Sequence, residues 1–224
     1  MADFTIYLGN KNYSSWSLRA WLMMKQTGAA FDEVVIPLDG AGRRTTAIRP
    51  FSPSGRVPAL KHGELVVWES SAIGEYLAEL FPEAKMWPAD RASRAIARAV
   101  SAEMHSSFAA LRTAMPMNVR RKEAKLPTTP AVDDDIARIV TLWRDCRARL
   151  GANASSGPFL FGTFGIADAM FAPVATRFRV YGVALDDGSR AYVDAIYAHP
   201  AMREWIEAGR REELVIESYE QVGG

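Results

Sequence analysis

Short apolar runs, separated by polar and turn-forming residues, fill the first eighty positions of the chain. Residues 4–8 (Phe-Thr-Ile-Tyr-Leu) and 34–36 (Val-Val-Ile) are rich in β-branched and aromatic side chains and are followed by glycine or proline, which is typical of strands. Residues 57–60 and 65–68 are two further apolar runs on either side of a His62-Gly63 turn. This spacing predicts a β-hairpin.

Two segments between these runs carry their apolar residues at helical spacing. We expect one helix over residues 14–27, ended by Gly28, and a second over residues 70–81. Residues 38–54 contain two glycines and two prolines, so we expect mostly loop there. The element order is then β-α-β-loop-β-β-α. The crossover helix makes the first two strands parallel, and the hairpin adds antiparallel neighbours.

The remainder of the chain shows no strand pattern and reads as helical. Its apolar periodicity predicts helices over residues 91–114, 132–150, 166–181, 192–198 and 200–208. The segment 166–181 is apolar on nearly all sides, so we place it at the centre, with Asp168 accepting a hydrogen bond from the amide of Gly165. The fold class is therefore α/β plus all-α. We expect an α/β domain over residues 1–81, a linker over 82–90 and a helical domain over 91–224.

Composition and charge exclude several classes of protein. The 224 residues are 49% hydrophobic and 24% charged, which are ordinary globular values. Twenty-seven Lys and Arg against 26 Asp and Glu give a net charge of +1, without the basic excess of a nucleic-acid surface. The start of the chain lacks the basic and apolar regions of a secretory signal, and the apolar stretch 167–178 is shorter than the ~20 residues of a membrane helix. We therefore expect a cytoplasmic protein with no nucleic-acid and no membrane partner.

Cysteine and histidine positions argue against disulfides and metals. Cys146 is the single cysteine and lies on an apolar helical face, so we expect it to be buried and the protein to suit a reducing compartment. His62, His105 and His199 are isolated and lack metal-ligand spacing, so we expect no metal. The glycine motifs that bind nucleotide phosphates are also absent from the sequence.

A serine-rich segment opens the first predicted helix. Ser14, Ser15 and Ser17 follow Tyr13 and precede Arg19. A hydroxyl at this place can donate a hydrogen bond to a thiolate, and the helix dipole adds to that stabilisation. The simpler interpretation is a cluster of helix caps.

Two more motifs lie at the predicted hairpin and at the helix after it. A cis Val57–Pro58 bond would turn the backbone of Val57 outward to a peptide-like ligand, whereas a trans proline in a loop is the simpler interpretation. Ser70 is a good N-cap, and a free helix N-terminus attracts anions. With Glu69 taking a ligand ammonium, Ser70 could hold a ligand carboxylate. Plain capping also accounts for Ser70.

Together and in this order, the motifs resemble the cytosolic glutathione transferase family over essentially the whole chain. The matching pieces are the serine-rich helix start ending in Arg19, Pro53-x-Gly55-Arg56-Val57-Pro58-Ala59-Leu60, Trp68-Glu69-Ser70-Ser71-Ala72-Ile73-x-x-Tyr76-Leu77, and Gly165-Ile-Ala-Asp168. The resemblance implies a thioredoxin-like N-terminal domain, an all-helical C-terminal domain and a homodimer. The Ser14-Ser15-x-Ser17 pattern looks most like the zeta class, which includes maleylacetoacetate isomerases, although Trp16 stands where that class has cysteine or a small residue.

The resemblance also implies glutathione as co-substrate and assigns its contacts. Val57 would pair through its backbone with the cysteinyl part, Pro58 would be the cis proline, and Glu69 and Ser70 would hold the γ-glutamyl end. The glycyl carboxylate would meet one of two arginine sites, Arg56 or the Arg43-Arg44 pair.

The same resemblance makes Ser14 the catalytic serine, with Ser15 and Tyr13 as the alternatives. The bound thiol would be activated as a thiolate that attacks a small electrophile, by conjugation in detoxification or by glutathione-dependent isomerisation. Two alternatives stay open: a maleylacetoacetate isomerase of aromatic amino-acid catabolism, and a non-catalytic glutathione-transferase-like binding protein.

The electrophile is expected between the domains, against the helix that begins at Arg91. Four residues are its predicted lining: Met104, Phe108, Arg112 and Met115. For Met104 and Phe108, a place in the hydrophobic core is the equally weighted alternative.

Overall fold

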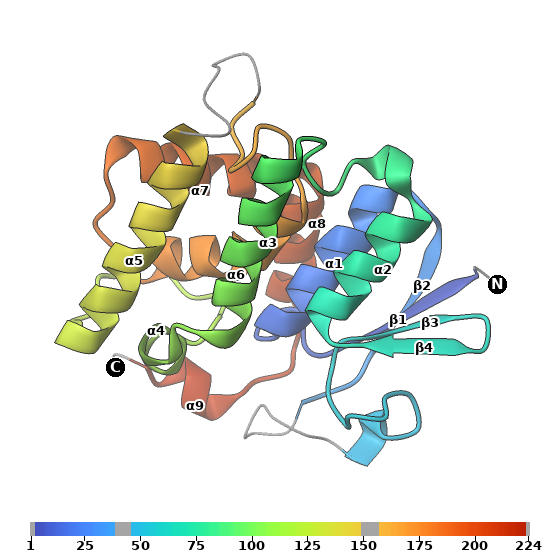
Figure 1. The fold of residues 1–224 in the computed structure, drawn as a ribbon. Coiled ribbons are helices and arrows are strands. Elements are labelled where there is room, and N and C mark those ends of the chain that lie inside the picture. The colour runs from blue at the N-terminus through green and yellow to red at the C-terminus, as the bar shows by residue number, and fades with distance from the viewer. Residues whose placement is uncertain (1–2, 39–45, 149–156, 223–224) are drawn as a thin grey trace.

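The N-terminal part of the chain is built on a four-stranded sheet (Figure 1). The structure, a computed structural model, describes residues 3–38, 46–148 and 157–222. The strands are β1 (Phe4–Leu8), β2 (Phe31–Val35), β3 (Ala59–His62) and β4 (Leu65–Trp68), in the spatial order β2-β1-β3-β4. β1 is parallel to β2 and antiparallel to β3, and β3 is antiparallel to β4, as predicted. β3 begins after Pro58 rather than at residue 57, because proline cannot donate to a strand ladder.

Helices α1 (Ser15–Thr27) and α2 (Ser70–Leu80) lie between the sheet and the helical part of the chain (Figure 1). Gly28 ends α1 in the left-handed conformation, with φ of 72°, as predicted. The two helices approach closely at Gly74, where an added Cβ would lie 2.8 Å from the Met23 sulfur. Glycine at this position therefore sets the distance between α1 and α2.

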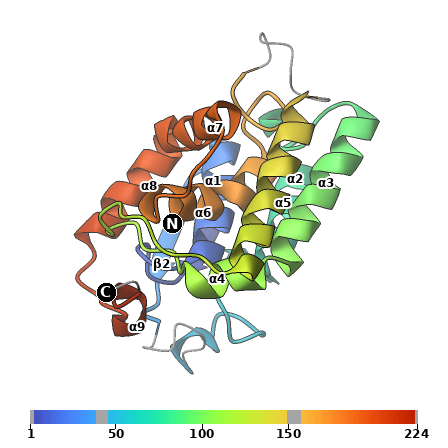
Figure 2. The ribbon, with the colours of Figure 1, turned by 90° about the vertical axis from the view of Figure 1, so that its left-hand side faces the viewer.

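The rest of the described chain contains seven α-helices joined by loops. Short 3-10 turns lie at Thr46–Ile48 and Pro82–Ala84. They are α3 (Arg91–Ser106), α4 (Ala109–Ala114), α5 (Pro130–Cys146), α6 (Ile166–Val180), α7 (Asp187–Ala198), α8 (Pro200–Arg211) and α9 (Glu217–Glu220). Figure 2 shows α6 at the centre, enclosed by its neighbours, and nearly all of its residues are buried. The expected central helix and the expected fold class are thereby confirmed.

The predicted helix over residues 91–114 is wrong in one respect, because it is broken into α3 and α4. Ser107 is extended and Phe108 is left-handed, with φ of 65°. This conformation places the Phe108 side chain in the core, where it is 5% exposed. Arg112 of α4 then donates to the carbonyls of Met104 and His105, which the broken helix would otherwise leave without partners.

Several helix ends also differ from the expectation because capping side chains set them. α5 begins at Pro130 instead of residue 132, after Thr129 as N-cap. α7 begins at Asp187 instead of residue 192, with the carboxylate of Asp186 accepting from the Ser189 amide at 2.8 Å. At α2 the predicted N-cap Ser70 is wrong, because Glu69 holds that position and Ser70 is the first helical residue.

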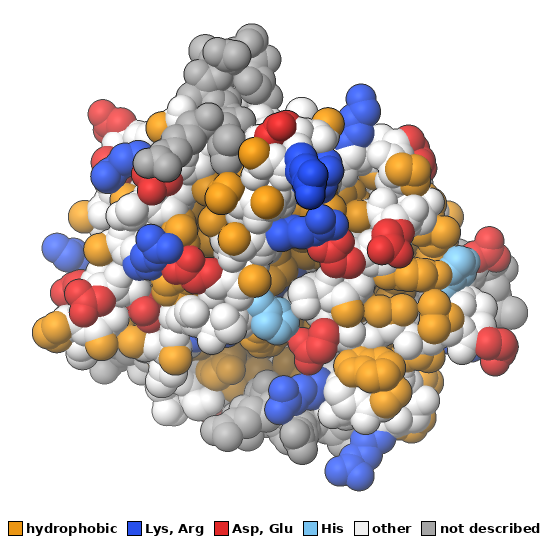
Figure 3. Space-filling model, in the orientation of Figure 1, with side chains coloured by type: hydrophobic (Ala, Val, Ile, Leu, Met, Phe, Trp, Pro, Cys, Tyr) orange, Lys and Arg blue, Asp and Glu red, His pale blue; other side chains and the backbone are white. Residues whose placement is uncertain are grey.

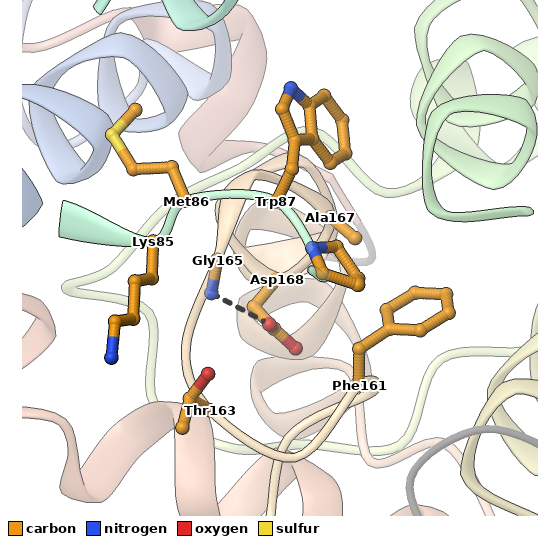
Figure 4. A pocket seen from close by; sticks show the side chains of 9 residues that line it. Lys85, Met86, Trp87, Phe161, Thr163, Gly165, Ala167 and Asp168 are labelled. Carbon is orange, nitrogen blue, oxygen red and sulfur yellow. Dashed lines mark hydrogen bonds between the residues drawn. The ribbon is translucent and has the colours of Figure 1, made fainter. Parts of the chain in front are cut away.

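A buried carboxylate, Asp168, joins the start of α6 to two other segments, and Figure 4 shows its bond to the Gly165 amide. Asp168 accepts hydrogen bonds from the amides of Gly165 and Leu160 and from the hydroxyl of Tyr192, each at 3.0 Å. The first of these bonds confirms the expected link to Gly165. Burial raises the pKa of Asp168 to about 6, although the hydrogen bonds oppose this shift.

One continuous hydrophobic core runs through both parts of the chain. Leu18 and Trp21 of α1, Phe171 of α6 and Trp205 of α8 all belong to it. Cys146 is 2% exposed, as expected, and burial raises the pKa of its thiol to about 12. The domain limits at residues 81 and 91 stay a prediction. Within residues 3–38, 46–148 and 157–222, none of the helices has the length and hydropathy that a membrane span requires.

Candidate functional site

The start of α1 brings together the predicted serine cluster. Ser14 is the N-cap: its Oγ accepts from the amide of Ser17 at 3.3 Å and donates to the Ser17 hydroxyl at 2.8 Å. Ser17 Oγ in turn accepts from the amide of Gly9 at 2.9 Å. Ser14 is 5% exposed, and Ser15, in the first turn, is half-buried. This end of the helix offers hydroxyls beside first-turn amides, the combination that stabilises an anion.

The hydroxyl of Tyr13 faces away from this helix start. It donates to Glu220 Oε1 at 2.5 Å and accepts from Arg120 Nη2 at 2.7 Å. The pKa of Tyr13 is raised, first by burial and then by the bond to Glu220. Both partners hold the phenol against the C-terminal segment, so Tyr13 would have to leave them to serve a ligand.

The loop before Ser14 is held from the far end of the chain. The Glu212 carboxylate accepts from the amides of Lys11 and Asn12, at 2.6 and 2.8 Å. The amide of Arg120 donates to Asn12 Oδ1 at 3.0 Å. The position of the serine cluster therefore depends on residues more than a hundred positions away, which no local motif reveals.

The segment before β3 has the predicted cis peptide bond between Val57 and Pro58. Val57 is half-buried, Pro58 is buried and Arg56 is exposed. The Arg56 amide donates to Ser54 Oγ at 3.3 Å. The predicted contacts of Val57 and Arg56 with glutathione remain predictions.

The start of α2 has an unusual polar arrangement. Glu69 has φ of 71°, a conformation that side chains rarely adopt, and its carboxylate lies 3.7 Å from His105 Nε2. Ser70 is fully buried, and its Oγ has no hydrogen-bond partner in the described structure. A buried hydroxyl without a partner is costly, so a ligand group that bonded to Ser70 would relieve that cost.

The two helix starts lie at one edge of the sheet. β1 and β4 are both antiparallel to β3, so they run in the same direction. α1 follows β1 and α2 follows β4, and Figure 1 shows both helices beginning at the same side of the molecule. Ser14 and Ser70 are therefore at the same edge of the sheet.

The residues expected to line the second-substrate pocket are mostly internal. Met104, Phe108 and Met115 are at most 5% exposed and belong to the hydrophobic core. Arg112 is half-buried at the end of α4. The assignment of these residues to a pocket stays a prediction, and Arg112 is the member with exposed surface.

Sequence reasoning did not place Trp16 and His105 in the site. Trp16 is half-buried in the first turn of α1, and its ring centroid lies 5.1 Å from that of His105 on α3. The pKa of His105 is lowered, mainly by burial, while the charge of Glu69 opposes this shift. The only sequence signal was the large aromatic residue directly after two serines.

Two further expectations concern residues and ions. Arg43, a candidate for the glycyl carboxylate, lies outside the described residues. Among the residues that the structure does describe, no group of three or more His, Cys, Asp or Glu side chains could hold a metal ion.

Two family descriptions match the chain and cover most of it. Residues 13–80 match "Glutathione S-transferase, N-terminal domain", and residues 126–208 match "Glutathione S-transferase, C-terminal domain". The chain is 28% identical over 213 residues to a maleylacetoacetate isomerase of Pseudomonas aeruginosa, covering 89% of this chain and 93% of that protein. It is 26% identical to protein LigF of a Sphingobium species, covering 92% of this chain and 95% of the relative.

Solved structures agree with these sequence relationships. A glutathione transferase homologue from Burkholderia gl BGR1, solved with bound glutathione, superposes with a TM-score of 0.70 at 26% identity. That match covers 93% of this chain and 99% of the other. With both domain descriptions matched in order and the fold shared with these structures, the chain belongs to the glutathione S-transferase family.

Proposed function

We propose that the protein is a glutathione transferase that binds glutathione along the edge where α1 and α2 begin and activates its thiol as a thiolate. The observation that carries this proposal is the fully buried, unpartnered hydroxyl of Ser70 at the start of α2. A ligand carboxylate at this helix N-terminus would accept from the Ser70 hydroxyl and from the first-turn amides. Glu69, beside it, would take the ammonium group of the same γ-glutamyl end.

Thiol activation falls to Ser14 in this proposal. Its O–H now donates to Ser17, and rotation about one side-chain bond redirects it to a ligand sulfur. The amides of the first turn of α1 add to the stabilisation of a thiolate. Tyr13 is the weaker candidate, because Glu220 and Arg120 already hold its hydroxyl.

The test is the ultraviolet titration of the thiolate of bound glutathione in three variants, Ser14→Ala, Ser15→Ala and Tyr13→Phe. A charge-assisted hydrogen bond is worth roughly 1.5–3 kcal/mol, so its loss in Ser14→Ala should raise the thiol pKa by about one to two units. Ser106→Ala, at an exposed position on α3, is the matched control. A shift only in Tyr13→Phe would refute the serine assignment, and a shift only in Ser15→Ala would move it by one residue.

The activated thiolate would attack a small electrophile held beside it, so proximity supplies much of the rate. A second candidate is glutathione-dependent isomerisation, favoured by the similarity to the Pseudomonas maleylacetoacetate isomerase. Conjugation consumes glutathione, whereas isomerisation returns it, so the amount of free thiol after turnover separates the two. A binding protein without catalysis would hold glutathione with an ordinary thiol pKa.

Homodimerisation, a cytoplasmic location and a role in detoxification belong to the same proposal.

A further inference from the structure

Two arginines lie against Trp16, and the charge of a third, Arg177, acts on Arg19 from a neighbouring helix. We call Arg19 of α1, Arg112 of α4 and Arg177 of α6 the arginine cluster. The guanidinium carbons of Arg19 and Arg112 lie 4.3 and 5.1 Å from the Trp16 ring centroid. Arg19 and Arg177 are buried, at 1% and 4% exposure, and Arg112 is half-buried. Two arginine side chains therefore lie against one partly exposed indole ring.

The hydrogen-bond acceptors that the arginine cluster contacts are neutral. Arg19 Nε donates to the Met170 carbonyl at 3.0 Å, and Arg177 Nε donates to the Met115 carbonyl at 2.7 Å. The described structure gives Arg112 only carbonyl acceptors as well, at the end of α3. Backbone carbonyls satisfy N–H groups without cancelling the positive charge, so the charge of the cluster remains.

Carboxylates also lie in the surroundings of the cluster. Asp135 favours the charged form of Arg112, and its carboxylate also accepts from the Leu111 amide at 2.9 Å. Glu69 lies next to His105, which contacts Trp16 and also feels the charges of Arg19 and Arg112. Mutual repulsion among the three arginines adds to burial in lowering the pKa of Arg19.

One guanidinium nitrogen of the cluster is unsatisfied. Arg19 Nη1 is buried and has no hydrogen-bond partner in the described structure. Burying a cation is costly unless it is paired, and removing one partner of a buried pair leaves a large penalty. An anion bound at the cluster would supply the missing negative charge.

The cluster lies next to the proposed thiolate position. Trp16 follows Ser14 by two residues in the first turn of α1, and its ring contacts His105, which in turn approaches Glu69. Figure 3 shows a hollow in the surface where the lower end of α3 faces the sheet domain, with hydrophobic side chains in its floor. An electrophile in this region would meet an indole face together with positive charge.

We propose that the arginine cluster makes this enzyme selective for electrophiles that carry a carboxylate or a similar planar anionic group. Arg112 contacts the anion directly, and Arg19 and Arg177 supply the positive field behind it. Trp16 packs against the apolar part of the substrate. The inference rests on the proposed glutathione transferase function. The family resemblance assigns the carboxylates of glutathione to the start of α2 and to Arg56 or the Arg43-Arg44 pair, so the cluster is left for the second substrate.

The test compares two electrophiles that differ in charge, 4-chloro-3,5-dinitrobenzoate and its primary amide. In both, the glutathione sulfur forms a bond to the ring carbon and chloride leaves with the electron pair. Each kcat/KM is divided by the uncatalysed rate with glutathione, which removes the difference in intrinsic reactivity. We expect the normalised ratio of benzoate to amide to be about tenfold or more, since a charge-assisted hydrogen bond is worth that much.

Variants then locate the preference. Arg112→Gln should reduce the benzoate-to-amide ratio to about one, and Arg112→Lys should restore part of it. Arg138→Gln, which removes an exposed arginine of α5 that pairs with Glu103 of α3, should leave the ratio unchanged. If Arg112→Gln does not fold, the wild-type protein gives a second measurement. Unsubstituted benzoate should competitively inhibit the turnover of 4-chloro-3,5-dinitrobenzamide, and unsubstituted benzamide should not.

Each outcome decides the proposal. A wild-type ratio near one, or an equal loss of both rates in Arg112→Gln, overturns the anion preference while leaving the proposed function intact. A weaker calorimetric affinity for glutathione in Arg112→Gln, with an unchanged ratio, would assign the cluster to glutathione itself. No glutathione binding by the wild-type protein would overturn the proposed function, and the inference with it.

Discussion

Replacing Asp168 with alanine should destabilise the protein more than most single substitutions. Three donors lose their acceptor at once: the amides of Gly165 and Leu160 and the hydroxyl of Tyr192. Each buried donor without a partner costs about 1–3 kcal/mol, and the three are not additive, so we expect a loss of about 3–6 kcal/mol. For a chain of this size, that corresponds to a fall in Tm of roughly 10–20 °C.

The measurement is chemical and thermal unfolding followed by circular dichroism. Tyr192→Phe is the matched control, because it removes one of the three bonds and should cost only about 1 kcal/mol. A loss below about 1 kcal/mol in Asp168→Ala would refute the view that this carboxylate joins the three segments. It would mean that water or other acceptors replace the carboxylate without cost.

The pH dependence of Asp168 gives an independent check. Its pKa in the folded protein is about 6, above the ordinary value of 3.8. The folded state therefore holds a proton that the unfolded state has already released, so this group lowers the free energy of unfolding as the pH rises from about 4 to 6. The gap of about two pH units corresponds to about 3 kcal/mol. Asp168→Asn removes this titration. The difference in free energy of unfolding between this variant and the wild type should therefore change by about 3 kcal/mol between pH 4 and pH 7.

Two further predictions concern the loop before α1 and the single cysteine. Glu212→Ala leaves the amides of Lys11 and Asn12 without their acceptor, so we expect a loss of about 1–3 kcal/mol in unfolding experiments and a raised pKa of the bound glutathione thiol. Glu213→Ala, the exposed neighbour, should change neither quantity, and an unchanged thiol titration in Glu212→Ala would separate this loop from thiol activation. Cys146, with its pKa raised to about 12, should resist a disulfide reagent at pH 8 in the folded protein and react on unfolding; fast labelling of the native protein would contradict its burial.

The sheet and most helices follow from local pattern, and the departures have identifiable causes. The hairpin around His62-Gly63 and the helix ended by Gly28 were predictable because turn and cap residues mark them. The break at Phe108 was not, because no glycine or proline stands there. Burial of the Phe108 side chain in the core compensates for its left-handed conformation, and tertiary packing of this kind is invisible to periodicity.

The candidate site also contains residues that the sequence could predict and residues that it could not. Ser14 and Glu69-Ser70 lie in short motifs at element starts, so sequence alone could propose them. Arg177 and His105 are scattered along two helices that read as ordinary amphipathic or apolar segments. The contact of His105 with Trp16 and the effect of Arg177 on Arg19 exist only in the folded chain. A charge cluster assembled from distant segments leaves no mark at any one of them.

The contact of Glu212 with the loop before Ser14 has a consequence for protein synthesis. During translation the strand, the serines and most helices emerge from the ribosome before residue 212, so a nascent chain carries its candidate thiol-activating residues without the carboxylate that fixes their loop. The reactive geometry is completed only when the last part of this chain has been released and has folded back. An electrophile-handling site would then stay inactive on unfinished chains, and a chain that stops just before Glu212 would lack the acceptor for the amides of Lys11 and Asn12 and be poorly reactive.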